Sequence, residues 1–298
     1  TGTITEITST IGSTTDLTAS GTLTFTDVDR DDYNHAASKT VAATGATAGL
    51  PVPAALEGFL SLTPVKGVGA DTGTVAWSFA ADDQVFDYLR HGETVTLTYT
   101  VNLDDQSGGT TASPATIAIT ITGSNDQPTL TAVDVTGAAI EDGSTPNLTD
   151  SGTINFADVD LTDTHTVTVT PVTPTVSAGA IPAATLTALA SALTASVTNA
   201  STGDGTGVVT WDFALANSAA QFLADGEVVT ATYNVSVTDN SAQGNSTSAN
   251  QLVTVTITGT DFPTSIADIE VTFGGEVAAV QTVNGTGTQI TVKTPAVA

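Results

Sequence analysis

Acidic and amide side chains recur at matched positions along this chain of 298 residues. Asp27 and Asp29 form an Asp-x-Asp pair, and the same spacing returns at Asp158 and Asp160. Side chains two residues apart on an extended strand share a face, so each pair turns two carboxylates toward one point. The other candidate ligands of this kind are Glu93, Asn125, Asp126, Glu141 and Asp239. Calcium takes about six to eight hard oxygen ligands, several of them carboxylates, so this set indicates calcium binding.

Two other interpretations of these residues are a solvated-loop role and an enzyme active site. Carboxylates are common in solvated loops, where they cap turns without binding an ion. An enzyme is a poor fit, because His35, His91 and His165 have no partner at metal-ligand spacing and no Gly-x-Ser-x-Gly motif is present. The adjacent acids Asp82 and Asp83 do not suit a glycosidase, whose carboxyl groups flank the substrate from a larger separation. The sequence therefore predicts a non-catalytic protein.

The overall composition excludes several further classes of protein. Five Lys and Arg stand against 31 Asp and Glu, for a formal net charge of −26, so no basic surface exists for nucleic acid. There is no Cys, which excludes disulfides and thiolate metal sites. No apolar run approaches the roughly 20 residues that span a bilayer, so no membrane insertion is expected. High acidity without Cys suits an extracellular protein, and the absence of an initial Met suggests a processed chain or part of a longer one.

A long internal repeat organises the chain. SGTLTFTDVDRDD at 20–32 matches SGTINFADVDLTD at 151–163, and LRHGETVTLTY at 89–99 matches LADGEVVTATY at 223–233. TITGSNDQP at 120–128 matches TITGTDFP at 256–263 with one residue missing. A period of about 130 residues is the size of a whole domain. The repeat predicts domains at 1–126 and 127–261, followed by a segment at 262–298.

The local pattern of both repeats is that of β-strands. Polar and apolar residues alternate strictly over 94–101 and 116–122, and clusters of Gly, Asn, Asp and Ser separate such runs. This pattern predicts an all-β protein built of tandem sandwiches. Short helical crossovers are expected within 82–90, 183–195 and 217–224. Trp77 and Trp211 hold equivalent places in apolar strands, which favours a core position over a ligand platform.

These motifs together resemble the VCBS repeat, an Ig-like module of large bacterial surface and secreted proteins. The resemblance rests on GTLTFTDVD, the Trp-x-Phe element, the Gly-Glu strand and ITGSNDQP, and it covers both repeats. It implies a rod of tandem Ig-like domains at the bacterial surface. Residues 268–298 instead resemble the second half of an IPT/TIG module through VTFGG and TQITVKTPA. The first half is missing unless 255–262 serves both domains.

The acidic positions also resemble the calcium site between cadherin domains. In an Ig-like topology, the loops that hold Asp158, Asp160 and Asp239 lie at the end nearest the linker. Asn125, Asp126, Asp158, Asp160 and Glu93 match the cadherin pattern residue by residue, although His91 stands where that pattern has a further acid.

The sequence therefore predicts an extracellular structural or adhesive protein of a bacterial surface, stiffened by calcium. Its expected partners are copies of itself or flanking repeats of the same polypeptide. One version is a filament or surface-layer subunit, in which a strand near 3–11 of the next subunit completes the C-terminal segment. The alternative is a carbohydrate-binding module of a secreted hydrolase, with a surface glycan as ligand and an exposed aromatic such as Tyr33 in contact with it.

Overall fold

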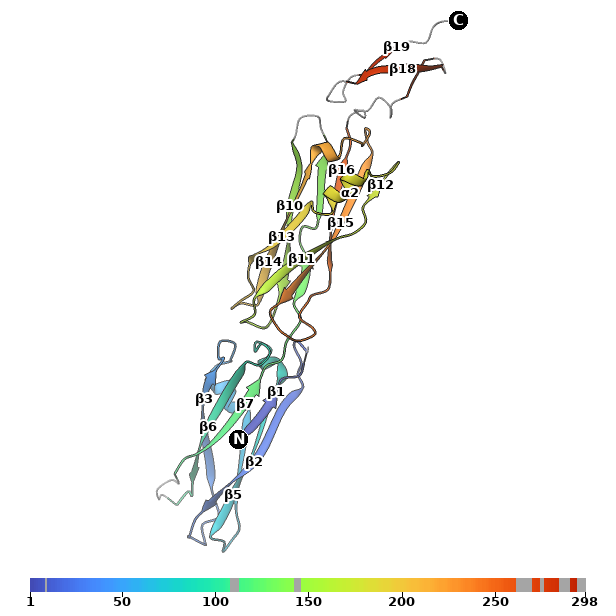
Figure 1. Cartoon of the computed structure of the whole chain (residues 1–298). Helices are drawn as coiled ribbons and strands as arrows, with labels where there is room; N and C mark the ends of the chain where they lie inside the picture. The colour runs from blue at the N-terminus through green and yellow to red at the C-terminus, as the bar shows by residue number, and fades with distance from the viewer. Residues whose placement is uncertain are drawn as a thin grey trace.

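The computed structural model describes residues 1–8, 10–107, 113–141, 146–260, 270–273, 276–283 and 290–293. It shows two β-sandwiches lying end to end, followed by a small separate sheet (Figure 1). The strands of the first sandwich lie within 2–122 and those of the second within 129–258. The division at 126/127 and 261/262 stays a prediction from the repeat.

Sandwich 1 consists of a three-stranded and a four-stranded sheet. The first has the order β2-β5-β4 and the second the order β1-β7-β6-β3. β1 runs parallel to β7, whereas the other neighbours are antiparallel. The strand bounds are β1 Gly2–Thr5, β2 Asp16–Thr26, β3 Ala36–Gly45, β4 Leu60–Lys66, β5 Thr72–Asp82, β6 Thr94–Asp104 and β7 Ala115–Thr122.

Sandwich 2 repeats this plan with an additional strand at one edge. Its sheets have the orders β13-β14-β10-β8 and β11-β15-β16-β9, with β12 also paired to β15. The strand bounds are β8 Thr129–Ala132, β9 Thr136–Ile140, β10 Asn147–Ala157, β11 His165–Pro171, β12 Thr175–Val176, β13 Leu193–Asn199, β14 Thr206–Ala216, β15 Val228–Asp239 and β16 Gln251–Thr258. This strand order is Ig-like and cadherin-like, which confirms the predicted fold class.

Each core lies between the two inward faces of its sandwich, as the period-two pattern predicts. Trp77 and Trp211 are both buried, so they are core residues. Gly21 and Gly152 lie directly opposite these Trp residues on the neighbouring strand. A Cβ at either Gly would lie 2.5–2.6 Å from the indole ring, so only Gly leaves room for it.

The helical segments are shorter than the sequence pattern predicts. α2 spans Ala183–Leu189, and the expected stretches at 82–90 and 217–224 contribute single 3₁₀ turns, η1 Asp83–Val85 and η2 Asn217–Ala219. α1, Pro53–Gly58, was not predicted, because a helix of six residues is too short to show helical periodicity. Within the described ranges, no helix has the length and apolar character needed to cross a membrane.

The C-terminal segment forms a three-stranded sheet of β17 Val271–Phe273, β18 Glu276–Val283 and β19 Ile290–Lys293. Strand β16 pairs with β15 and β9 and thus belongs to sandwich 2. The expectation that a strand near 3–11 is donated to another subunit is not supported. Residues 2–5 already pair with β7, and the Glu6 N–H continues the pairing by donating to the Thr122 carbonyl.

Candidate metal centre between the two sandwiches

The linker after β7 is buried where the two sandwiches meet. Asn125 and Asp126 are almost completely inaccessible to solvent. The Asn125 side-chain amide donates to Asp239 Oδ2 over 3.2 Å, and the Asp126 N–H donates to Asp160 Oδ2 over 2.9 Å. A backbone bond from Leu161 N–H to the Tyr88 carbonyl also crosses the junction. The linker is therefore bound to two loops of sandwich 2.

Those two loops begin where β10 and β15 end, at the linker end of sandwich 2 (Figure 1). The first loop is held by local bonds, since Asp158 Oδ1 accepts the Asp160 N–H over 3.0 Å. The buried His165 ring contacts Asp158 Oδ2 at 2.7 Å and fixes its orientation. The structure thus brings together Asn125, Asp126, Asp158, Asp160 and Asp239, all from the sequence-predicted set.

Sandwich 1 contributes three buried acids that the sequence analysis missed. Glu6 Oε2 accepts the Ser124 N–H over 2.8 Å, Asp83 Oδ1 accepts the Ile7 N–H over 2.9 Å, and Asp87 Oδ2 accepts the Gly12 N–H over 2.7 Å. Glu6 follows β1 as Glu141 follows β9, so the repeat could have identified it. Asp83 and Asp87 could not be found in this way, because sandwich 2 has amides at their positions.

The carboxylates of the junction form two compact groups. Oxygen atoms of Glu6, Asp87 and Asp126 all lie within 4.8 Å of one another, and so do those of Asp158, Asp163 and Asp239. Asp163 belongs to the repeated motif of the first loop, but its role was not predicted. Asp160 interacts electrostatically with members of both groups. Every member is buried, so the groups are parts of one acidic centre.

Many oxygens of this centre are buried without a hydrogen-bond partner in the described part of the chain. They are Glu6 Oε1, Asp87 Oδ1, Asn125 Oδ1, Asp126 Oδ1, Asp160 Oδ1 and both Asp163 carboxylate oxygens. Among the described residues, the cationic Arg90 side chain lies 3.6 Å from Asp163, and the His165 ring contacts Asp158. Buried carboxylates without compensating charge are costly, so the arrangement calls for bound cations.

The pKa values of these acids reflect the same excess of buried negative charge. Burial, with smaller contributions from Asp158, Asp126 and Asp163, raises the pKa of Asp160 to about 9. Burial also raises the pKa of Glu6 to about 9, of Asp126 to about 7 and of Asp163 to about 6. An ion with a strong preference for oxygen ligands would favour the ionised forms, and calcium fits this all-oxygen set.

Glu93 lies at the junction but outside both groups. Its Oε1 accepts the Thr162 hydroxyl over 2.8 Å and is 3.8 Å from Arg90 Nε. His91, the departure from the cadherin pattern, contacts the Gln243 side chain across the same junction. These residues therefore connect the two sandwiches through direct polar contacts.

Asp27 and Asp29 lie at the opposite end of sandwich 1, where a lysine supplies the positive charge. The fully buried Lys66 ammonium donates to Asp27 Oδ2 over 2.7 Å and to the Asp29 and Asp32 carbonyls over 2.6 and 2.9 Å. The hydrogen bond from Lys66 lowers the pKa of Asp27. The structure does not bring this pair into the junction, and the ammonium already fills the place of a cation.

Glu141 lies at the far end of sandwich 2. Its carboxylate accepts the Gln221 side-chain amide and, over 3.3 Å, the Thr260 N–H. Gln221 stands where sandwich 1 has Asp87, and Asn217 where it has Asp83. Neutral amides thus replace the acids at this end, so the charge that builds up around Glu6 does not arise around Glu141.

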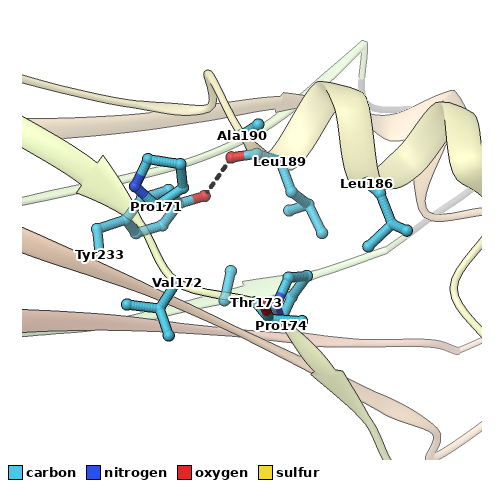
Figure 2. A pocket seen from close by; sticks show the side chains of 9 residues that line it. Pro171, Val172, Thr173, Pro174, Leu186, Leu189, Ala190 and Tyr233 are labelled. Carbon is cyan, nitrogen blue, oxygen red and sulfur yellow. Dashed lines mark hydrogen bonds between the residues drawn. The ribbon is translucent and has the colours of Figure 1, made fainter.

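The apolar pocket of about 310 Å³ beside α2 differs in character (Figure 2). Pro171, Pro174 and Leu186 line it, together with Tyr233, whose hydroxyl donates to the Leu189 carbonyl over 2.8 Å. Burial raises the pKa of Tyr233 to about 12. The lining therefore offers no group that transfers protons near neutral pH.

Comparisons with known proteins give one family match. The IPT/TIG domain family matches residues 240–298, which include β16 of sandwich 2 and the C-terminal sheet. The match includes residues 268–298, which resemble an IPT/TIG module in sequence. It begins at residue 240, upstream of the C-terminal segment expected at 262–298. No curated protein matches the chain.

Several solved structures are similar to the chain at low identity. The adhesive subunit CfaE of CFA/I fimbria of enterotoxigenic Escherichia coli is 10% identical, with 65% of each chain covered and a TM-score of 0.35. Zebrafish RET cadherin-like domains 1 to 4 are 12% identical, with 87% of this chain and 49% of theirs covered and a TM-score of 0.28. Drosophila N-cadherin EC1-4 is also 12% identical, with 88% and 48% covered and a TM-score of 0.30. The chain thus spans about half to two thirds of these structures. The fold assignment rests on the strand order.

Proposed function

We propose that the chain is a non-catalytic, adhesive or structural element of an extracellular bacterial surface, in which calcium locks two Ig-like sandwiches into a stiff rod. One observation carries this proposal. Carboxylates from sandwich 1, the linker and sandwich 2 are buried together, with many oxygens left without a hydrogen bond. A flexible linker needs no such centre, whereas a rod held by ions does.

The two acidic groups indicate which residues would hold calcium. Glu6, Asp87 and Asp126 would hold one ion, and Asp158, Asp163 and Asp239 a second. The buried free oxygens of Asn125 and Asp160 are available as additional ligands between them. Bound calcium would supply positive charge and connect oxygens of both sandwiches, which restricts their relative motion.

The bacterial and extracellular parts of the proposal rest on the VCBS resemblance of both repeats and on the acidic, Cys-free composition. The carbohydrate-binding alternative has less support. Both Trp residues are buried, and Tyr33 is the aromatic side chain that stands out as exposed in the described part of the chain. A single ring offers a smaller stacking surface than a glycan-binding face needs.

The proposal is tested by small-angle scattering and thermal unfolding of the full chain, with calcium and with excess chelator. Calcium should give a longer, more rigid particle and a higher Tm. The matched variants are Asp160→Asn at the junction and Asp29→Asn at the opposite end. Asp160→Asn should remove most of the calcium response and Asp29→Asn should keep it. An equal response in both variants, or no response in the parent chain, would contradict the proposal.

A further inference from the structure

The two acidic groups of the junction differ in the cations beside them. The first group consists of Glu6, Asp87 and Asp126, and the second of Asp158, Asp163 and Asp239. In the part of the chain that the structure describes, no Lys or Arg side chain lies within ion-pair distance of the first group. Arg90 of sandwich 1 lies beside the second group, with its Nη1 atom 3.6 Å from Asp163 Oδ1. An incoming cation therefore meets more negative surroundings at the first group.

The pKa values of one acid from each group show the same difference. Burial raises the pKa of Glu6 to about 9, and the charges that act on it, from Asp126 and two other carboxylates, raise it further. Burial also raises the pKa of Asp163, to about 6, but Arg90 is among the groups that oppose this rise. The guanidinium therefore stabilises the ionised form of Asp163 without a metal ion.

Arg90 approaches two acids without a hydrogen bond to either. Its Nε atom lies 3.8 Å from Glu93 Oε1 and is buried without a hydrogen-bond partner within the described ranges. Both carboxylate oxygens of Asp163, which is 1% exposed, also lack a partner there. A small pocket of about 100 Å³ lies between these side chains and Asn240. This space exceeds what a single water needs, so the guanidinium has room to move aside.

The outer end of sandwich 1 shows what such a cation does. There the Lys66 ammonium bonds to Asp27, the repeat equivalent of Asp158, and takes the place of a metal ion. The equivalent of Arg90 in the second repeat is Ala224, at the end of sandwich 2 where amides replace the acids. Basic side chains of sandwich 1 thus supply part of the positive charge at both Asp-x-Asp loops.

We propose that Arg90 is a built-in competitor of calcium at the second group. Without calcium, it partly neutralises Asp163 and connects sandwich 1 to sandwich 2. Calcium at the second group has to displace or repel this cation, whereas calcium at the first group meets none. The second group should therefore bind its ion about tenfold more weakly than the first, although both ions are bound at millimolar free calcium. This inference rests on the calcium proposal and adds that the rod stiffens in two steps.

Calcium titration of the full chain by isothermal titration calorimetry tests this order. The parent should show a tighter and a weaker binding step. Arg90→Gln, which removes the charge, should strengthen the weaker step about tenfold and leave the tighter step unchanged. Arg90→Lys, which keeps the charge, should bind calcium as the parent does. Arg30→Gln, beside the exposed Asp71 at the outer end, is the matched control and should change neither step.

Two further variants assign the steps to the groups. Asp87→Asn should weaken the tighter step, and Asp163→Asn should weaken the other. If Arg90 acts through Asp163, Arg90→Gln should have little additional effect in the Asp163→Asn chain. Loss of the tighter step in Asp163→Asn, or a full Arg90→Gln effect in that chain, would overturn the assignment of Arg90 to the second group.

Thermal unfolding provides a readout without calcium. In chelator near about pH 8, Arg90→Gln should lower the Tm, because Asp163 stays buried without its counter-charge. In saturating calcium the difference from the parent should largely disappear. Indistinguishable steps in the parent, a weaker step unchanged in Arg90→Gln, or an unchanged Tm in chelator would overturn this inference and leave the calcium proposal intact. Arg90→Lys with the affinities of Arg90→Gln would also overturn it, because the effect would then come from packing. A parent chain that binds no calcium would overturn both proposals.

Discussion

The backbone N–H of Asp126 donates to the carboxylate of Asp160 over 2.9 Å, so the linker is anchored in the first loop of sandwich 2. This bond uses one oxygen of Asp160 and leaves the other buried and free. The position is therefore suited to bind an ion and to fix the angle between the sandwiches at the same time.

Replacing Asp160 by Asn should weaken calcium binding. The change removes a buried negative charge and keeps the shape of the side chain, so the metal-free fold should be retained or stabilised. We expect at least a tenfold loss of calcium affinity, about 1.4 kcal/mol, in isothermal titration calorimetry. Asp29→Asn serves as the control at the other end of sandwich 1. Unchanged affinity in Asp160→Asn would exclude this carboxylate from the site.

The stability of the metal-free chain should fall as pH rises. The folded-state pKa values of Glu6 and Asp160, about 9, and of Asp126, about 7, lie above the usual carboxyl values near 4. The folded chain therefore holds more protons than the unfolded chain between these limits, which favours folding at lower pH. In chelator, the Tm should be higher near about pH 5.5 than near about pH 8.5.

Calcium should reverse this trend, because protons compete with the ion for the same carboxylates. The rise in Tm on adding calcium is expected to be larger near about pH 8.5 than near about pH 5.5. Asp160→Asn should show a smaller pH dependence in chelator. A metal-free Tm that increases with pH across this window would contradict the assignment of these carboxylates.

Replacing Lys66 by Met should destabilise the chain whether or not calcium is present. The buried ammonium is the partner of Asp27 and of two backbone carbonyls, so its removal leaves all three without that bond. A loss of about 3 kcal/mol is expected in denaturant unfolding. Arg30→Ala, which breaks the exposed pair with Asp71, should change the stability far less, because solvent screens that pair. Rescue of Lys66→Met by chelator-sensitive calcium binding would show instead that this end can bind an ion.

Replacing Gln221 by Glu should reproduce the charge imbalance at the far end of sandwich 2. The Gln221 amide donates to Glu141, and a carboxylate in its place would repel that acid. The variant should have a lower Tm than the parent in chelator, and calcium should recover part of the difference. Gln221→Ala, which loses the bond without adding charge, is the control. Equal calcium responses in both variants would show that the added carboxylate binds no ion.

Much of this architecture could be predicted from the sequence, because strand periodicity and the repeat both report on core packing. The alternation at 94–101 and the paired Trp residues led directly to the sandwiches. The loops with Asp158, Asp160 and Asp239 could be placed beside the linker because the Ig-like topology fixes which loops share an end.

The roles of individual acids could not be predicted in this way, because they depend on side-chain contacts that differ between the two repeats. Matching equivalent positions assigned Asp27 and Asp29 the same role as Asp158 and Asp160. The two pairs differ because Lys66 bonds to the first pair and sandwich 2 has no matching cation. The same matching overlooked Asp87, since Gln221 occupies its place in the second repeat. Positions at which the two repeats differ in charge, such as Asp87 and Gln221, therefore show which end of a sandwich can bind a cation.

We expect the junction to bind calcium through its two acidic groups. Equilibrium dialysis of the full chain, with bound calcium measured by mass spectrometry, tests it most directly. We expect at least two tightly bound ions per chain, matching the two groups, and a reduced number in Asp160→Asn. A parent chain that retains no calcium at millimolar free concentration, or that retains the same amount as Asp160→Asn, would contradict it.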